Sequence, residues 1–372
     1  MITPEQVELL AEPLLSLYGQ LEADLLHNIA IKFQQGLPTV TDDFDWFASK
    51  LQEVGGLRRE NLALIAKMSG KALKDVERIM REAGYRSLDL AESIYLDAQR
   101  AGLTIYQAMP LTASPVIQQI LQATVDNAKS VLNLVNTTAL ESANTEFLKI
   151  VNQVYLETSV GIYSYEDSVW KATRELADQG ITGITYATAA GKIIRRTPEV
   201  AVRQMILTTS AESAGKLQMA RADEWGAELM EVSSHWGARP EHAEWQGKIY
   251  RVHGRDSKYQ NLAEATGYGT GEGLCGYNCR HVMYPFWPGI SEQRYHPYDL
   301  RENERRYNES QQQRAIEREL RKQKRREVVA EAEGKETELR KAREKIAEKS
   351  REMRELIKRT GMVRQRAREN IA

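Results

Sequence analysis

Apolar residues three and four positions apart dominate this chain, and that spacing restricts most of it to α-helix. The first such stripe consists of Val7, Leu10, Leu14, Leu17, Leu21 and Leu25. Residues with this spacing fall on one side of a helix, where they can be buried together. Just before the stripe, Thr3 can cap the helix, Pro4 suits its first position, and Gln6 completes a capping box. The sequence therefore predicts a helix that begins at Pro4 and buries one face.

Glycines punctuate the rest of the N-terminal helical region, which we place at residues 1–114. The expected breaks are Gly36 with Pro38, Gly55-Gly56, Gly70, Gly84 and Gly102. Glycine weakens a helix interior and is common where helices end. Aspartates at 42, 43 and 45 suit the start of the second helix, where negative charge meets the positive end of the dipole. We expect a stack of short helices joined by tight turns.

The middle helical region, residues 115–229, is predicted to be helical to residue 178 with an interruption at Gly161. A β-hairpin near 184–195 follows, because two short β-branched runs flank a turn of small residues that ends at Gly191. Another helix is expected from Pro198 to about Trp225. These patterns make the first 229 residues multi-helical.

Residues 230–298 have a different composition, which predicts a small, loop-rich α+β module. Met230, Val232 and Ser234 alternate as in a strand, and a second short strand is expected at 249–253. Five of the six histidines and both cysteines lie between residues 235 and 296. The aromatic residues expected to form the core of the module are Trp236, Trp245, Tyr250, Tyr268, Tyr277, Tyr284, Phe286 and Trp287.

The C-terminal region, residues 299–372, consists almost wholly of charged residues and helix formers. Leu339, Ile346 and Met353 recur at intervals of seven, with Ala342, Leu356 and Val363 at companion positions and Lys349 out of place. This weak heptad predicts a long charged helix rather than a stable coiled coil. The region has too few apolar residues for a folded catalytic domain. The fold class is therefore mainly α.

Charge is distributed unevenly along the chain, although the net charge is only −1. Residues 301–372 hold 23 basic and 15 acidic residues, a net of +8, which leaves −9 for the first 300. A basic tail on an acidic body suits a polyanion or an acidic protein surface as partner. The densest basic run is Arg321, Lys322, Lys324, Arg325 and Arg326. It could contact DNA phosphates, while the alternative is a solvated helix with internal ion pairs.

The sequence gives no indication of a membrane span or of a secretory start. The longest run without charge, residues 102–125, contains Pro110, Pro115 and four glutamines. Such a segment would insert poorly into a bilayer. The N-terminus lacks a basic start and an apolar h-region. Two cysteines only four residues apart suggest a reducing compartment.

The segment most able to carry chemistry is Cys275-Gly276-Tyr277-Asn278-Cys279-Arg280-His281. Two thiolates and an imidazole at this spacing can face one zinc ion, with His235 or His242 as the fourth ligand of a structural site. A second interpretation is a tight loop without a metal, in which the thiols are buried and the histidines are hydrogen-bonded. A third is a nucleophile–base pair of Cys279 with His281 or His242, although no orienting carboxylate is identifiable. Arg239 could place a guanidinium beside this loop.

The string Gly271-Glu272-Gly273-Leu274-Cys275-Gly276 matches the glycine pattern of dinucleotide-binding loops. We reject that function because no strand–helix unit surrounds the string, and aromatic residues and a proline follow it. The glycines instead indicate a backbone that turns sharply or approaches another segment closely.

The order of short motifs in the module resembles the phage minor capsid protein 2 family. The motifs are His235-Trp236-Gly237-Ala238-Arg239-Pro240-Glu241-His242, continuing to Tyr250; Thr266-Gly267-Tyr268-Gly269; Gly273 to His281; Pro285-Phe286; and Pro288-Gly289. Further segments resemble the start, middle and helical end of that family. These are Leu21 to Leu26 with Gly55-Gly56-Leu57, Ile181 to Tyr186, and Gln313 to Arg318. The tail after Gly334 is the part that matches least.

This resemblance implies a structural, non-enzymatic, low-copy protein of a tailed-phage head. It further implies portal and capsid proteins as partners, possible oligomerisation on the portal ring, and a role in head assembly, DNA packaging or DNA delivery. The expected location is the virion head near the portal vertex, with the host cytoplasm during assembly, and the basic tail would contact packaged DNA. The alternatives are a virion-borne nuclease or Cys/His hydrolase that uses the Cys275–His281 loop, and a DNA-binding packaging factor.

Overall fold

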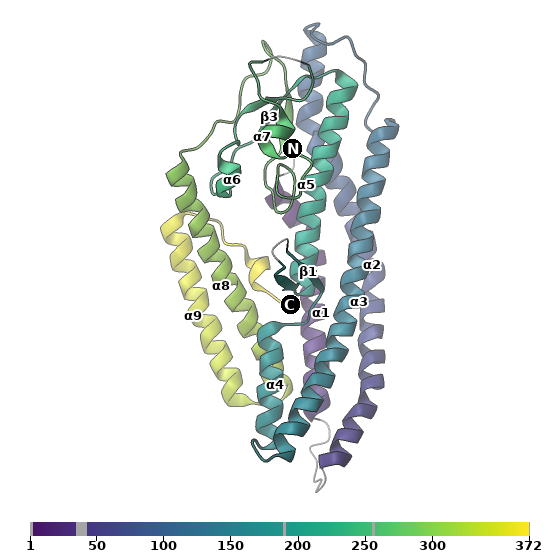
Figure 1. The fold of residues 1–372 in the computed structure, drawn as a ribbon, viewed down its shortest axis with the longest axis vertical. Coiled ribbons are helices and arrows are strands. Elements are labelled where there is room, and N and C mark those ends of the chain that lie inside the picture. Colours follow the sequence, from purple (N-terminus) through teal and green to yellow (C-terminus); the bar gives the residue numbers. More distant parts are fainter. Residues whose placement is uncertain (1–2, 35–42, 189–190, 255–256, 372) are drawn as a thin grey trace. The chain divides into compact units, whose positions relative to one another are not determined.

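The structure, a computed structural model, describes residues 3–34, 43–188, 191–254 and 257–371 and is mainly α-helical (Figure 1). The long helices are α1 (Pro4–Gln34), α2 (Asp43–Arg100), α3 (Pro115–Ser159), α4 (Tyr165–Gln179), α5 (Pro198–Trp225), α8 (Leu300–Ala332) and α9 (Glu336–Thr360). The short ones are α6 (Pro240–Ala243), α7 (Leu262–Thr266) and the 3-10 helix η1 (Arg366–Glu369). The mainly-α fold class is confirmed.

The strands form two small antiparallel sheets. β1 (Ile184–Ala187) pairs with β2 (Ile193–Arg196) in the expected hairpin. β3 (Leu229–Val232) lies between β4 (Ile249–Arg251) and β5 (Met283–Phe286) in the second sheet. The predicted strands at 230–234 and 249–253 are thus confirmed. β5 was not predicted, because Met283-Tyr284-Pro285-Phe286 is apolar throughout and shows no alternation of apolar and polar residues.

The chain divides into two compact units, each made of three separate segments. Unit 1 comprises Met1–Ala11, Lys74–Ser130 and Arg203–Gln312, and unit 2 comprises Glu12–Leu73, Val131–Val202 and Gln313–Ala372. The boundaries expected from sequence at 114, 229 and 298 follow chain order and stay a prediction. None of the described helices is both long enough and apolar enough to cross a membrane.

The start of α1 shows the predicted capping box. The backbone N–H of Gln6 donates to Thr3 Oγ1 at 3.3 Å, and Gln6 Oε1 accepts from the Thr3 N–H at 2.9 Å. Gly161 and Gly180 end α3 and α4 near the predicted positions, with φ of 70° and 75°. The break expected at Gly36 and Pro38, like Asp42, lies outside the described residues.

The predicted stack of short helices before residue 110 is wrong. Helix α2 runs unbroken for 58 residues and contains Gly55, Gly56, Gly70 and Gly84 in its interior. Gly84 packs closely on α3, since a Cβ there would lie 2.3 Å from Leu121 Cδ2 and the buried Leu121 side chain would have to shift. A glycine inside a helix destabilises it by only about 1 kcal/mol relative to alanine. The burial of a long apolar face contributes more than this. The break expected at Gly102 is present.

The C-terminal region forms two helices rather than the single long helix expected. The chain reverses at Gly334, which has a φ of 64°. Ile316 and Leu320 of α8 then meet Met353 and Leu356 of α9 in a small buried cluster. Figure 1 shows α8 and α9 side by side along this contact. Ile346, Met353 and Leu356 of the predicted heptad therefore pack on α8, whereas Val363 lies beyond α9 and is 74% exposed.

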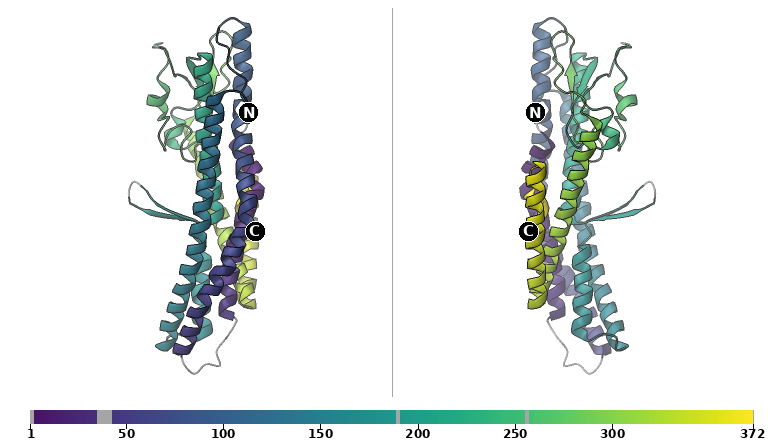
Figure 2. Two further views of the ribbon diagram at one scale, coloured as in Figure 1. Left: turned by 90° about the vertical axis from the view of Figure 1, so that its right-hand side faces the viewer. Right: turned by 90° about the vertical axis from the view of Figure 1, so that its left-hand side faces the viewer.

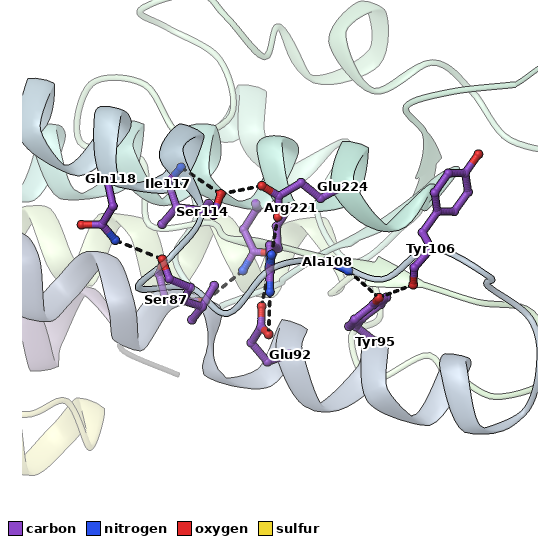
Figure 3. Close-up of polar contacts among 12 residues, drawn as sticks. Ser87, Glu92, Tyr95, Tyr106, Ala108, Ser114, Ile117, Gln118, Arg221 and Glu224 are labelled. Carbon is purple, nitrogen blue, oxygen red and sulfur yellow. Dashed lines mark hydrogen bonds and ion pairs between the residues drawn. The ribbon is translucent and has the colours of Figure 1, made fainter.

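In unit 1, a buried arginine ties the end of α5 to α2 and to the loop before α3 (Figure 3). Arg221 is 1% exposed and binds both carboxylate oxygens of Glu92 at 2.6 and 2.9 Å. It also pairs with Glu224, whose carboxylate accepts from Ser114 Oγ at 2.6 Å. One turn further along α5, Trp225 stacks on Tyr95 with ring centroids 4.4 Å apart. These contacts fix the point from which the chain enters β3.

Candidate functional site: the cysteine and histidine cluster

The module that carries the cysteines and histidines is built on the three-stranded sheet of unit 1. Met230 and Val232 of β3, Tyr250 of β4, and Met283 with Tyr284 of β5 belong to one buried core cluster. Trp245 and Trp287 are part of the same cluster, and Tyr268 packs against it. Trp236 and Tyr277 are instead exposed, so only part of the aromatic set expected to be core lies there.

The glycines on either side of Cys275 allow the backbone to fold tightly on itself. A Cβ on Gly273 would lie 2.0 Å from the carbonyl oxygen of Gly267, and one on Gly276 would lie 2.3 Å from that of Gly271. The close approach expected of these glycines is therefore made within the loop. Cys275 and Asn278 adopt positive φ of 63° and 53°, which is rare for residues with a Cβ. The surrounding fold thus imposes the direction of the Cys275 side chain.

Three side chains from two parts of the module converge as one possible metal-binding group. The ligand atoms of His242, Cys279 and His281 all lie within 4.8 Å of one another, and all three residues are buried. His242 comes from α6, whereas Cys279 and His281 lie in the segment that leads into β5. The sheet therefore brings together ligands that are almost 40 positions apart in the sequence.

Hydrogen bonds fix the His281 ring with one nitrogen facing sulfur. Its Nε2 lies 3.0 Å from the Oε1 of Gln246, an atom that can only accept, so Nε2 carries the proton. The unprotonated Nδ1 then faces Cys279 Sγ at 3.6 Å. Metal-binding histidines show this arrangement, in which the outer N–H is held by an oxygen and the inner nitrogen is free.

His235 lies against the same group, and its position depends on the same glutamine. The backbone N–H of His235 donates to Gln246 Oε1 at 3.0 Å, and Gln246 is fully buried. The His235 and His281 rings have centroids 4.4 Å apart. His235 Nδ1 contacts the Trp236 carbonyl oxygen at 3.2 Å, while its buried Nε2 has no hydrogen-bond partner among the described residues.

His242 has a polar shell of its own. Its Nε2 lies 2.9 Å from the carbonyl oxygen of Glu272 and 2.8 Å from Arg239 Nη2. Arg239 also donates to the Tyr277 carbonyl oxygen at 3.2 Å and approaches the exposed Glu272 carboxylate at 3.4 Å. The sequence suggested a guanidinium beside this loop, and the structure places Arg239 there.

Burial sets the protonation of the cluster. It holds the pKa of His281 well below its ordinary value and lowers the pKa of His235 and His242. The same desolvation raises the pKa of both cysteines, and backbone hydrogen bonds and the Arg239 guanidinium offset it only in part at Cys279. The side chains are consequently neutral imidazoles and thiols, the reverse of an activated thiolate–imidazolium pair.

The tentative ligands from sequence are thus all in one neighbourhood, at different distances. Cys279, His281 and His242 form the close group, and His235 adjoins it. Cys275 Sγ lies 3.8 Å from the His281 carbonyl oxygen and packs near Gly215 of α5. Sequence reasoning missed Gln246, whose role depends on two contacts, one of them to a residue 35 positions away.

The second candidate site from sequence, the basic run in α8, makes its contacts within unit 2. Arg326 binds both carboxylate oxygens of Asp178 at 2.5 and 2.7 Å, and Lys322 lies 3.9 Å from the same group. Arg325 donates to the Ala177 carbonyl oxygen at 2.7 Å. Arg321 donates to the Arg368 carbonyl oxygen, and Lys324 donates to the side-chain oxygen of Asn370. A phosphate contact by these residues stays a prediction, and it would compete with these bonds.

The chain is similar to known phage proteins over most of its length. A model of the phage minor capsid protein 2 family matches residues 2–358. A "structural protein" of Lactococcus phage LL-H is 26% identical over 302 residues, which cover 78% of each chain. A "structural protein" of Lactococcus phage mv4 is 43% identical over 68 residues, 18% of this chain and 55% of that one. No solved structure matches.

The family match covers nearly the whole chain, including both helical regions, the cysteine and histidine module and most of the C-terminal helices. The resemblance found in the short motifs is therefore confirmed, and the chain belongs to the phage minor capsid protein 2 family.

Proposed function

We propose that this protein is a structural component of the phage head that associates with the portal and supports head assembly, DNA packaging or DNA delivery. The family match over residues 2–358 carries this proposal. The structural proteins of two Lactococcus phages support a role in the particle. We further propose that several copies sit on the portal ring near the portal vertex of the virion, after assembly in the host cytoplasm.

Quantitative mass spectrometry of purified particles, normalised to the portal protein, tests this function. We expect a constant, low ratio to the portal in full particles and in particles that have released their DNA. Loss of the protein on DNA release would contradict a fixed portal component and indicate delivery with the DNA. Its absence from full particles would contradict the head assignment altogether.

We also propose a structural zinc ion as the cofactor of the cysteine and histidine module, bound by His242, Cys279, His281 and His235. In a tetrahedral site with Zn–S of about 2.3 Å and Zn–N of about 2.0–2.1 Å, sulfur and nitrogen are about 3.6 Å apart. The distance from Cys279 Sγ to His281 Nδ1 is 3.6 Å. The same distance suits a thiol–imidazole hydrogen bond, so the rest of the group decides between them.

Two features of the group favour the metal over the hydrogen bond. His235 Nε2 is buried without a partner, and a fourth coordination bond would satisfy it. His281 is already oriented through its outer nitrogen by Gln246. Arg239 Nη2 lies 2.8 Å from His242 Nε2. Binding of a cation by His242 would break this contact, and Arg239 would keep its bonds to the Tyr277 carbonyl oxygen and the Glu272 carboxylate.

Elemental analysis of the full-length protein, purified from zinc-supplemented cells, tests the zinc site. We expect about one zinc per chain in the wild type, and at least a tenfold loss in His281→Ala and Cys279→Ser, as removal of a ligand should produce. His235→Ala should weaken retention against a chelator, whereas Cys275→Ser should retain the metal. A folded wild-type protein without zinc would contradict the site. If the Cys275→Ser variant lost its zinc and His235→Ala kept it, Cys275 rather than His235 would be the fourth ligand.

The enzymatic alternative is disfavoured by the same geometry, and we propose that the protein has no catalytic activity. Cys279 and His281 are 5% and 1% exposed, so a substrate has no access to them. The outer nitrogen of His281 binds an amide, where a hydrolase would place an orienting carboxylate. If Cys279→Ala particles assemble normally but lose a nuclease or hydrolase activity that wild-type particles possess, this proposal fails.

A contact between the basic tail and packaged DNA remains part of the proposal, restricted to cations outside the run at 321–326. Candidates are the exposed cations Arg340 and Lys341 of α9, which pair with Glu344 and Glu338 on the same helix. Removing residues 336–372 should then reduce binding of the full chain to duplex DNA at low salt. Binding that depends instead on Arg326 would point back to the run in α8.

A further inference from the structure

The hairpin of β1 and β2 is a separate arm with a firm base. At its base Ile181 is buried, the Thr182 N–H donates to Ser142 Oγ of α3 at 2.9 Å, and the Gly183 N–H donates to the Arg196 carbonyl oxygen at 2.7 Å. Beyond the base, the two strands extend away from the helices of unit 2 (Figure 2). Near the turn, the Thr188 N–H donates to the Lys192 carbonyl oxygen at 2.9 Å.

The two faces of this arm differ. Ile184, Tyr186 and Ile194 lie on one face and are half-buried against one another and against Arg196. The opposite face is exposed along both strands and consists of Thr185 and Ala187 from β1 with Ile193 and Arg195 from β2. Ile193 is 59% exposed.

An arm of this kind is poorly supported on its own. A two-stranded hairpin is at best marginally stable in water, and here each strand has only four residues. Both outer edges also leave backbone groups available for pairing. Ile193 places an apolar side chain on this open face, beside the cation Arg195.

Charge indicates the nature of that surface. Residues 179–198 contain Lys192, Arg195 and Arg196 and no acidic residue. Within the described residues, none of these three cations has a carboxylate partner, and the Arg196 guanidinium donates to the Tyr186 hydroxyl at 3.5 Å. The remainder of the first 300 residues carries a net charge of −12. The arm is thus a positive element of a chain whose body is negative.

We infer that the β1–β2 arm docks through Ile193 and Arg195 on the acidic body of a second copy of this chain. Its basic face meets carboxylates there, while Ile193 leaves water. A mixed apolar and basic face with one isoleucine suits a protein surface better than a DNA backbone, which offers phosphates but no apolar partner at its rim. The cations also hinder open-ended pairing of the strand edges, so association proceeds through side chains.

Sedimentation velocity of the full-length protein over a range of concentration and salt tests this inference. We expect the wild type to associate reversibly, more weakly at high salt because the attraction is between charges. The variant Ile193→Ser with Arg195→Glu should remain monomeric under the same conditions and keep its helical circular dichroism. The matched control is Ile105→Ser, which changes an isoleucine that is 90% exposed in unit 1 and should associate like the wild type.

Three results would overturn the inference. One is a wild type that is monomeric up to the highest micromolar concentrations, and another is association that is unchanged in the double variant. The third is a monomer that binds duplex DNA through the arm, which would make nucleic acid the partner. None of these depends on portal binding, so the inference can fail while the proposed function stands, and the reverse.

Discussion

At the residue scale, individual side chains show how far burial can override ordinary chemistry in this protein. Glu333 follows α8 at the reversal into α9 and is only 4% exposed. Burial raises the pKa of its carboxyl to about 7, with Thr173 and Lys335 opposing the shift. A group of this kind makes the folded state depend on pH in a range where most carboxyls are already charged.

The Glu333 pKa fixes the sign of one prediction. The folded carboxyl holds its proton more tightly than the unfolded chain, whose value is 4.5, so the free energy of unfolding falls as pH rises from 4.5 to about 7. Glu333→Gln removes this loss and should stabilise the protein at pH 8 by roughly 3 kcal/mol at most, at 1.36 kcal/mol per pKa unit. At pH 4 the variant should show little difference. Urea unfolding at both pH values measures this, and an equal effect at the two would contradict it.

Two glycines provide a contrasting pair of residue-scale predictions. Gly273→Ala would force a Cβ to within 2.0 Å of a backbone oxygen and should destabilise the protein by about 1–3 kcal/mol. Gly56→Ala meets nothing within 4 Å in the interior of α2 and should stabilise it by about 1 kcal/mol. Thermal unfolding of both variants provides the comparison. The same sign for both would show that the loop around Gly273 can move apart.

At the element scale, helices are held in register by a few buried polar links as well as by apolar faces. The Arg221 network joins α2, α5 and the segment before α3, at the end of α5 that leads into β3 (Figure 3). A buried guanidinium with two carboxylates adds little net stability relative to apolar residues, but its loss leaves charges without a partner. The network therefore fixes the position of the elements more than it strengthens them.

Arg221→Ala tests the network. Because Glu92 and Glu224 keep about a quarter of their side-chain surface exposed, we expect a loss of about 2–4 kcal/mol, somewhat below the usual range for a fully buried pair. Arg100→Ala is the control, since its pair with Asp97 is exposed and should matter by less than about 0.5 kcal/mol. Chemical unfolding of the two variants decides the matter, and equal losses would remove any special role for Arg221.

At the scale of the whole molecule, segments from distant parts of the sequence assemble each compact unit. Unit 1 holds the cysteine and histidine module, and unit 2 holds α9 with the part of α8 that follows Gln312. A zinc ion in the module should stabilise the residues around it without being needed by the helices of unit 2. The two units thus offer an internal comparison within one chain.

Removal of zinc from the full chain should change one module and spare the other. After treatment with a chelator, we expect faster amide exchange in residues 230–298 and unchanged exchange in residues 336–360. Hydrogen exchange with mass spectrometry reports both regions in one sample. Uniform acceleration would mean that the metal stabilises the whole chain, and no acceleration would argue against a structural ion.

The sequence by itself determined the elements whose information is local. Apolar spacing and the capping box placed α1, Pro198 indicated the start of α5, a small-residue turn placed the β1–β2 hairpin, and the order of short motifs gave the family. Glycine counted as a helix breaker misled the prediction for α2, which contains four glycines in its interior. Local propensities of about 1 kcal/mol cannot decide against tertiary packing.

Only the tertiary structure decided the contacts between residues far apart in sequence. It selected His242 to join Cys279 and His281, brought in Gln246 to orient the ring, and gave the basic run at 321–326 internal partners such as Asp178. It also divided the C-terminal region into α8 and α9. Spacing along the chain reports which residues share a face of one element, whereas ligand sets and ion pairs depend on how faces of different elements meet.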